Sequence, residues 1–107
     1  MKKVLLVAVL AFAVAQPVQA TTREEAQKIC GAVSEIAEVI MDARQKGVPI
    51  QRMIDLMADA GEYQDLAYEL ILEAYDYPHI GTDRLVNDVI REFKTKTYLS
   101  CVRVWRK

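Results

Sequence analysis

The residue types that most often carry catalysis are few in this chain. It contains one histidine, His79, and beyond its first twenty residues only two serines, Ser34 and Ser100. A catalytic serine needs a base beside its hydroxyl and donors that hold the oxyanion. The helical spacing places Ser34 on the polar side of an expected helix, and the four glycines form no loop that could cradle an oxyanion or a phosphate. One histidine and two cysteines give no metal-ligand spacing. We therefore expect a protein that is not an enzyme and that holds no metal or cofactor.

Carboxylates are abundant, and their distribution along the chain is uneven. Residues 53–83 include eight acidic side chains and no Lys or Arg, whereas the residues from 84 onward include seven basic and two acidic ones. Asp65, Glu69 and Glu73 recur at every fourth position, which is the spacing of one solvated helix face. Two interpretations of this polarity stay open. The charges pair between neighbouring helices, or they form a surface that steers a charged macromolecular partner.

Two short segments carry aromatic side chains of the kind that anchor interfaces. Residues 75–80 form an expected turn with Tyr75, Tyr77 and His79, and an imidazole responds to pH between roughly 5 and 8. The basic C-terminal tail contains Trp105 and suits contact with a protein or transient contact with anionic lipid. In both segments the alternative is packing within the domain. The predicted partner-binding residues are Asp65, Glu69, Glu73, Tyr75, Tyr77, His79 and Trp105.

Residues 1–20 have the three-part pattern of a secretory leader. Two lysines precede twelve consecutive apolar residues, and a small residue, Ala20, closes the segment. Twelve apolar residues are too few to cross a bilayer, which takes about 20. We expect cleavage after Ala20, export to the periplasm or the medium, and one mature domain, residues 21–107, with a net charge of -3. This charge does not favour nucleic acid as a partner, and the length excludes a multi-domain enzyme.

Apolar residues recur along the mature chain with the period of α-helices. The pattern predicts an all-α domain of four helices, at about residues 23–46, 49–60, 62–75 and 82–103. A Thr-x-x-Glu capping box at Thr22 is expected to begin the first helix, and Gly47 is expected to end it. Pro49 is expected to be the first residue of the second helix. Residues 95–104 are also rich in β-branched and aromatic side chains, so a strand is the alternative there.

The two cysteines lie near opposite ends of the mature chain. Cys30 falls near the start of the first helix and Cys101 near the end of the last. If these helices pack antiparallel, both thiols reach the same end of the domain, where an exported protein forms a disulfide. Two buried free thiols are the alternative.

In its leader, its length and the placement of Cys30 and Cys101, the chain resembles two groups of small exported helical proteins. One group is the phage-encoded lysozyme inhibitors of the spackle type, which block superinfection, and the other is the acid-stress chaperones of the enteric periplasm. The resemblance is one of architecture and includes no shared motif, so it assigns a role to no residue. Together with the charge pattern it implies a non-enzymatic inhibitor, immunity or exclusion factor. Its partner would be another protein, for example a basic cell-wall lysozyme. A periplasmic acid-stress chaperone is the alternative, and the oligomeric state stays open.

Overall fold

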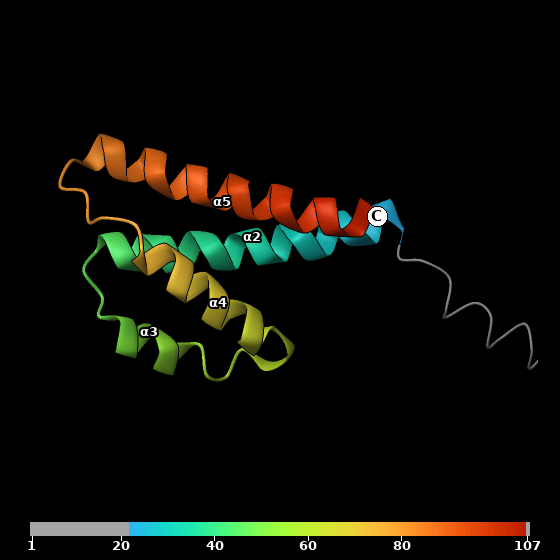
Figure 1. Ribbon diagram of the computed structural model, residues 1–107, viewed down its shortest axis with the longest axis horizontal. Coiled ribbons are helices and arrows are strands. Elements are labelled where there is room, and N and C mark those ends of the chain that lie inside the picture. Colours follow the sequence, from blue (N-terminus) through green and yellow to red (C-terminus); the bar gives the residue numbers. More distant parts are fainter. Residues whose placement is uncertain (1–21, 107) are drawn as a thin grey trace, which may run out of the picture.

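Helices account for the whole architecture of the part of the chain that the structure describes (Figure 1). The computed structural model describes residues 22–106, so the expected leader lies outside the described residues. In chain order the elements are α2 (Arg23–Gln45), α3 (Ile50–Leu56), the 3₁₀ turn η1 (Gly61–Tyr63), α4 (Gln64–Tyr75) and α5 (Asp83–Arg106). The predicted all-α domain of four helices is confirmed. Residues 95–104 are helical, and no strand occurs in residues 22–106.

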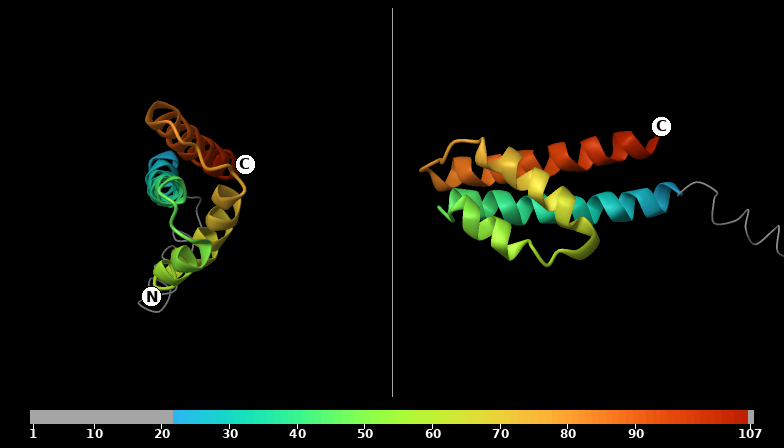
Figure 2. Two further views of the ribbon diagram at one scale, coloured as in Figure 1. Left: turned by 90° about the vertical axis from the view of Figure 1, so that its left-hand side faces the viewer. Right: turned by 60° about the horizontal axis from the view of Figure 1, so that its bottom comes forward.

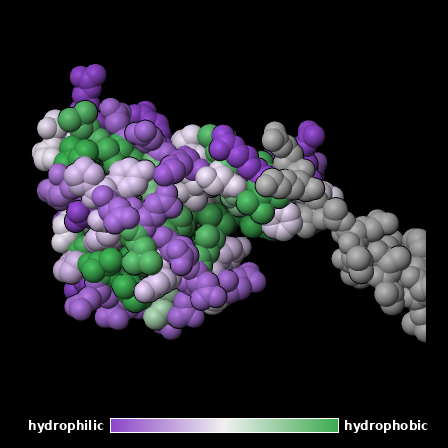
Figure 3. Space-filling view, viewed as in Figure 1, coloured by the Kyte–Doolittle hydropathy of each residue, from purple (hydrophilic) through white to green (hydrophobic). Residues whose placement is uncertain are grey.

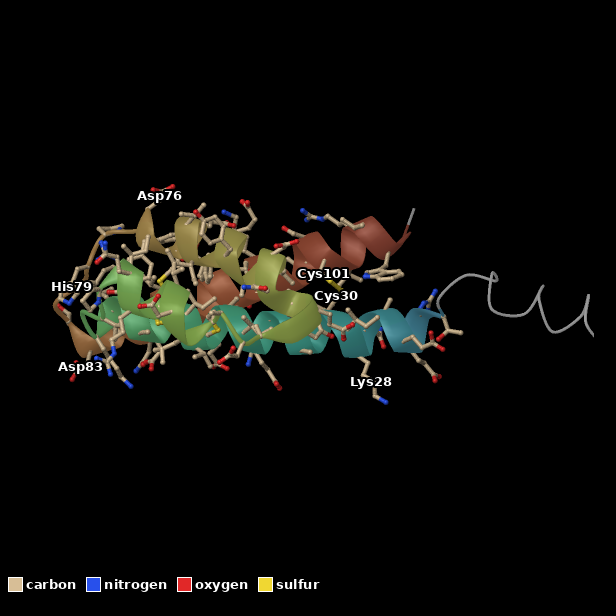
Figure 4. All side chains as sticks on the ribbon, turned by 90° about the horizontal axis from the view of Figure 1, so that it is seen from below. Lys28, Cys30, Asp76, His79, Asp83 and Cys101 are labelled. Carbon is tan, nitrogen blue, oxygen red and sulfur yellow. A yellow bond between two sulfur atoms is a disulfide. The ribbon has the colours of Figure 1, made fainter. Side chains whose placement is uncertain are left out.

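The two longest helices form an antiparallel pair that carries the rest of the fold. α2 has 23 residues and α5 has 24, and they lie side by side along most of their length (Figures 1 and 2). Near one end, the Cys30–Cys101 disulfide joins them, with Cα atoms 5.5 Å apart (Figure 4). Cys30 is fully buried. The predicted antiparallel pairing and its covalent link are therefore confirmed, and the alternative of two free thiols is wrong.

The main apolar cluster packs the shorter helices against the other half of this pair. Its largest buried side chains are Ile40 and Met41 of α2, Met53 of α3, Ile71 of α4 and Phe93 of α5. α4 crosses the C-terminal half of α2 and runs in roughly the same direction, while α3 packs mainly on α4 (Figure 1). The core is thus concentrated away from the disulfide, which leaves the two ends of the helix pair stabilised by different means.

The first helix begins at the predicted residue, Arg23, and ends at Gln45, one residue before the predicted end. The backbone N–H of Glu25 donates to Thr22 Oγ1 at 3.1 Å, which satisfies one of the unpaired donors of the first turn. Gly47 follows the helix with φ +83°, a conformation that glycine adopts without steric cost. None of the helices in residues 22–106 is both long enough and apolar enough to span a bilayer.

The second helix is shorter than predicted at both ends. Pro49 is the N-cap of α3 in an extended conformation and precedes the first helical residue, Ile50. The helix ends at Leu56 rather than near residue 60. Beyond it, the Ala58 N–H donates to the Asp55 carbonyl, so the hydrogen bonds here join residues three apart rather than four apart. The chain then turns into η1.

The expected placement of Ser34 on the polar side of the first helix is wrong. Ser34 is 5% exposed, and its hydroxyl donates to the Gly31 carbonyl at 2.7 Å. A serine that bonds the preceding turn of its own helix needs no other partner and is accepted in a core.

Removing the disulfide in a C30A/C101A variant is expected to lower the free energy of unfolding by about 4 kcal/mol. The reason is that the crosslink joins residues 71 apart and restricts the unfolded chain. Urea unfolding followed by far-UV circular dichroism measures the difference. Reductant should bring the wild-type protein to the stability of the variant and leave the variant itself unchanged. A wild-type midpoint that does not move under reductant would contradict this prediction.

Candidate functional site

The aromatic turn at residues 75–80 is held against the C-terminal end of α2. The Arg44 guanidinium donates from Nε and Nη2 to the Tyr77 carbonyl at 3.1 and 3.0 Å, and it lies over the Tyr75 ring, 5.2 Å from the centroid. The Tyr75 hydroxyl donates to the Val48 carbonyl, and the Tyr77 ring meets Phe93 edge to face with centroids 5.5 Å apart. Burial raises the pKa of the Tyr75 phenol, and the positive charge of Arg44 offsets only part of this increase. Both tyrosines are half-buried and engaged within the domain.

Gln45 secures the same turn from within the core. Its side chain is 5% exposed, its Nε2 donates to the Pro78 carbonyl at 3.0 Å, and its Oε1 accepts from the Ile80 N–H at 2.8 Å. This role of Gln45 is not among those predicted from the sequence. A signal was present, because Gln45 lies four residues after Met41 on the apolar stripe of the first helix, where a polar side chain needs buried partners.

His79 lies exposed at the end of the molecule opposite the disulfide (Figure 4). With Asp42, Lys46 and Asp83 it borders a shallow polar hollow of about 460 Å³. Asp42 and Lys46 form an ion pair of 2.8 Å within α2. No group of three or more His, Cys, Asp or Glu side chains in residues 22–106 has the arrangement that a metal ion needs.

Part of the acidic stretch pairs with the basic last helix. Lys96 Nζ of α5 lies 3.0 Å from Glu73 Oε1 of α4, and Lys94 Nζ lies 3.0 Å from Glu38 Oε1 of α2. The hydrogen bond and the charge of Glu73 raise the pKa of the Lys96 amino group, with smaller contributions from Tyr77. The two pairs tie α5 to both of the helices beside it.

The rest of the acidic stretch is not used in this way. Of the eight acids in residues 53–83, Glu73 alone forms an ion pair with another described side chain. Asp65 and Glu69 are exposed on α4. Internal pairing is therefore confirmed for one carboxylate of the stretch, and the other seven face solvent.

An apolar groove lies between α4 and α5 near the disulfide, and we call it the α4–α5 groove. It has a volume of about 370 Å³. The α4 wall consists of Leu66, Glu69, Leu70 and Glu73; the α5 wall consists of Lys96, Thr97, Ser100, Cys101, Val104 and Trp105; Val33 of α2 lies between them. Figure 3 shows apolar surface running into the space between the two helices. Val104 is 71% exposed and Trp105 is 43% exposed, so the groove leaves large apolar side chains in contact with solvent.

The groove gathers residues that were predicted from separate parts of the sequence. Glu69, Glu73 and Trp105 line it, Asp65 lies one turn away on α4, and the tyrosines and His79 lie elsewhere. The apolar walls could not be predicted from the sequence, because Leu66 and Leu70 follow the same helical stripe as core residues. A larger hollow of about 560 Å³ follows the outer face of α5 alone and has no facing wall. The α4–α5 groove is therefore the best-formed candidate site in residues 22–106.

The polar groups that line the α4–α5 groove include two carboxylates, one amine and two hydroxyls. Ser100 contributes a hydroxyl, but His79 lies at the other end of the molecule, so these two do not form a nucleophile and base. Glu73 and Lys96 form an ion pair with each other.

Comparison with protein-family models, with curated proteins and with solved structures found no match to this chain.

Replacing Gln45 by alanine is expected to lower the free energy of unfolding by about 1–3 kcal/mol. The substitution leaves the partly buried hydrogen bonds to the Pro78 carbonyl and from the Ile80 N–H unmade. Gln27 is an exposed glutamine of the same helix, and Q27A should change stability by less than about 0.5 kcal/mol. Urea unfolding of the two variants measures both effects, and equal stabilities would show that the Gln45 contacts do not hold the turn.

Proposed function

We propose that this chain is a non-enzymatic binding protein that holds a segment of a protein partner in the α4–α5 groove. In this proposal it works in the periplasm after export, as an inhibitor, immunity or exclusion factor. The observation that carries the proposal is the groove itself. Its lining includes the exposed side chains of Val104 and Trp105 and the half-buried Leu66, beside Glu69, which forms no ion pair with another described side chain.

The composition of the walls supports binding of a macromolecule. A half-exposed tryptophan with neighbouring aliphatic side chains is typical of the central residues of protein interfaces. Exposed apolar surface of this kind has a cost in solubility unless a partner covers it. The disulfide agrees with an oxidising compartment, where such crosslinks persist.

Replacing Val104 by lysine is expected to weaken binding of the natural partner roughly tenfold, because a charge would enter the apolar wall of the groove. V39K is the matched control, since Val39 is 55% exposed on α2, is absent from the groove lining and gains the same charge. The mature protein would be used to capture and identify the partner from periplasmic extract. Dissociation constants of the three proteins would then be measured by calorimetry. Equal affinities for V104K and V39K would contradict the proposal.

A specific observation also favours the acid-stress chaperone as a second candidate. The two ion pairs that tie α5 to α2 and α4 both depend on glutamates, Glu38 and Glu73. Carboxylates become protonated below about pH 4, and the two lysines would then keep their charge without a partner. Loosening α5 would expose the core residues beneath it to clients.

The chaperone candidate predicts that the protein binds a hydrophobic dye and suppresses aggregation of a client protein below about pH 4. In an E38Q/E73Q variant the rise in dye fluorescence should move toward neutral pH, since the pairs are already lost. An E24Q/E35Q variant changes two exposed glutamates of α2 and should titrate as wild type. A compact protein that binds no dye at about pH 3 would exclude the chaperone role.

A further inference from the structure

Within residues 22–106, the end of the pair formed by the α2 N-terminus and the α5 C-terminus has no third helix beside it. α4 has 12 residues and packs along the C-terminal half of α2, from Val33 toward Arg44. Figures 1 and 2 show that the α2–α5 pair extends past the N-terminal end of α4 toward the disulfide end. The α4–α5 groove opens at this step, so it lies where a further helix would continue the packing.

The walls of the groove restrict the conformation of a bound segment. Both walls are helices, and their backbone N–H and carbonyl groups are bonded within each helix. An extended segment would therefore find no backbone partners and would bury its own polar groups unpaired. A helix satisfies its own backbone. The wall residues recur at helical spacing, with Leu66 and Leu70 facing Cys101 and Trp105, and such ridges accept the ridge of another helix.

The charged residues at the groove restrict the sign of the charge that a bound segment can carry. Glu73 is neutralised by Lys96, whereas Glu69 lines the groove and forms no ion pair with another described side chain. Asp65 lies one turn earlier on the same helix and is also exposed and unpaired among the described residues. Residues 53–83 contain no Lys or Arg, so the α4 side of the groove has no basic side chain to neutralise these two carboxylates.

We infer that the occupant of the α4–α5 groove is a basic amphipathic helix of the partner protein. Its apolar face lies on Leu66, Leu70 and Trp105, and a Lys or Arg on its flank faces Glu69. This inference rests on the proposed function and adds the chemistry of the bound segment to it. The four α4 residues of the wall span two helical turns, so contact over about two turns of the bound helix fills the groove.

Trp105 provides the measurement, because it is the only tryptophan of the chain and is half-exposed in the groove. Two synthetic helical peptides of about 15 residues, both without tryptophan, would share a leucine stripe and carry either lysines or glutamates on its flanks. The emission of Trp105 in the mature protein should shift to shorter wavelength on titration with the basic peptide. The basic peptide should bind about fivefold more tightly than the acidic one, a modest factor because exposed ion pairs are weak.

The substitution E69K should reverse this preference, so that the acidic peptide becomes the tighter ligand. E35K is the matched control, because Glu35 is an exposed glutamate of α2 outside the groove lining and undergoes the same change of charge. It should keep the preference for the basic peptide. Circular dichroism of both variants establishes that each is folded.

Three results would overturn the inference. The first is no shift of Trp105 emission with either peptide, and the second is equal affinities that E69K does not alter. The third is a shift with anionic phospholipid vesicles but not with the basic peptide, which would assign the groove to a membrane surface. If one of the first two results occurs while V104K still weakens the natural complex and V39K does not, the proposed function stands and only the basic helix is excluded.

Discussion

The disulfide between Cys30 and Cys101 is the constraint on which the groove end of this molecule depends. The large buried side chains of the core, such as Ile40 and Phe93, lie toward the opposite half of the α2–α5 pair. Among the described residues, the N-terminal end of α2 and the C-terminal end of α5 extend past α4 and have no third helix beside them (Figure 1). A covalent link there holds α5 against α2 without help from a deep core. The link fixes α5 relative to α2 at this end, and with it the position of one wall of the α4–α5 groove.

The opposite end is held by polar contacts of the α2 C-terminus. Arg44 and Gln45 together donate to or accept from three backbone groups of the connection between α4 and α5. These contacts set where α5 begins, and the disulfide sets where it meets α2 near its end. The direction of α5, and with it the shape of the α4–α5 groove, is thus set near both of its ends.

 The polar contacts of Arg44 and Gln45 fix the start of α5, and the disulfide fixes its position near the other end. Loss of either would change the shape of the α4–α5 groove.

The sequence predicted the helices well, because their period and their ends depend on residues close in the chain. Thr22 and Gly47 carry local signals that need no knowledge of the tertiary structure. The second helix was predicted too long because Met57 and Ala60 continue its apolar spacing, although the chain there already turns toward η1. The Tyr75 hydroxyl and the Tyr77 carbonyl find their partners in Val48 and Arg44, 27 and 33 residues away along the chain. Periodicity carries no information about such distant partners, and for the same reason it did not reveal a groove built from three helices.

The uneven charge of the chain is divided between two roles by geometry. Glu73 faces α5 and pairs with Lys96, so it contributes to the position of a groove wall, whereas Glu69, one turn earlier, faces the opening. An exposed carboxylate adds little affinity by itself, but it disfavours an acidic ligand and accelerates the approach of a basic one. Apolar contact with Leu66, Leu70 and Trp105 would supply most of the binding free energy in the proposed complex. Selectivity for a basic ligand would then come from a few carboxylates along α4. Reversing the charge at Glu69 would change this selectivity while leaving the apolar contacts in place.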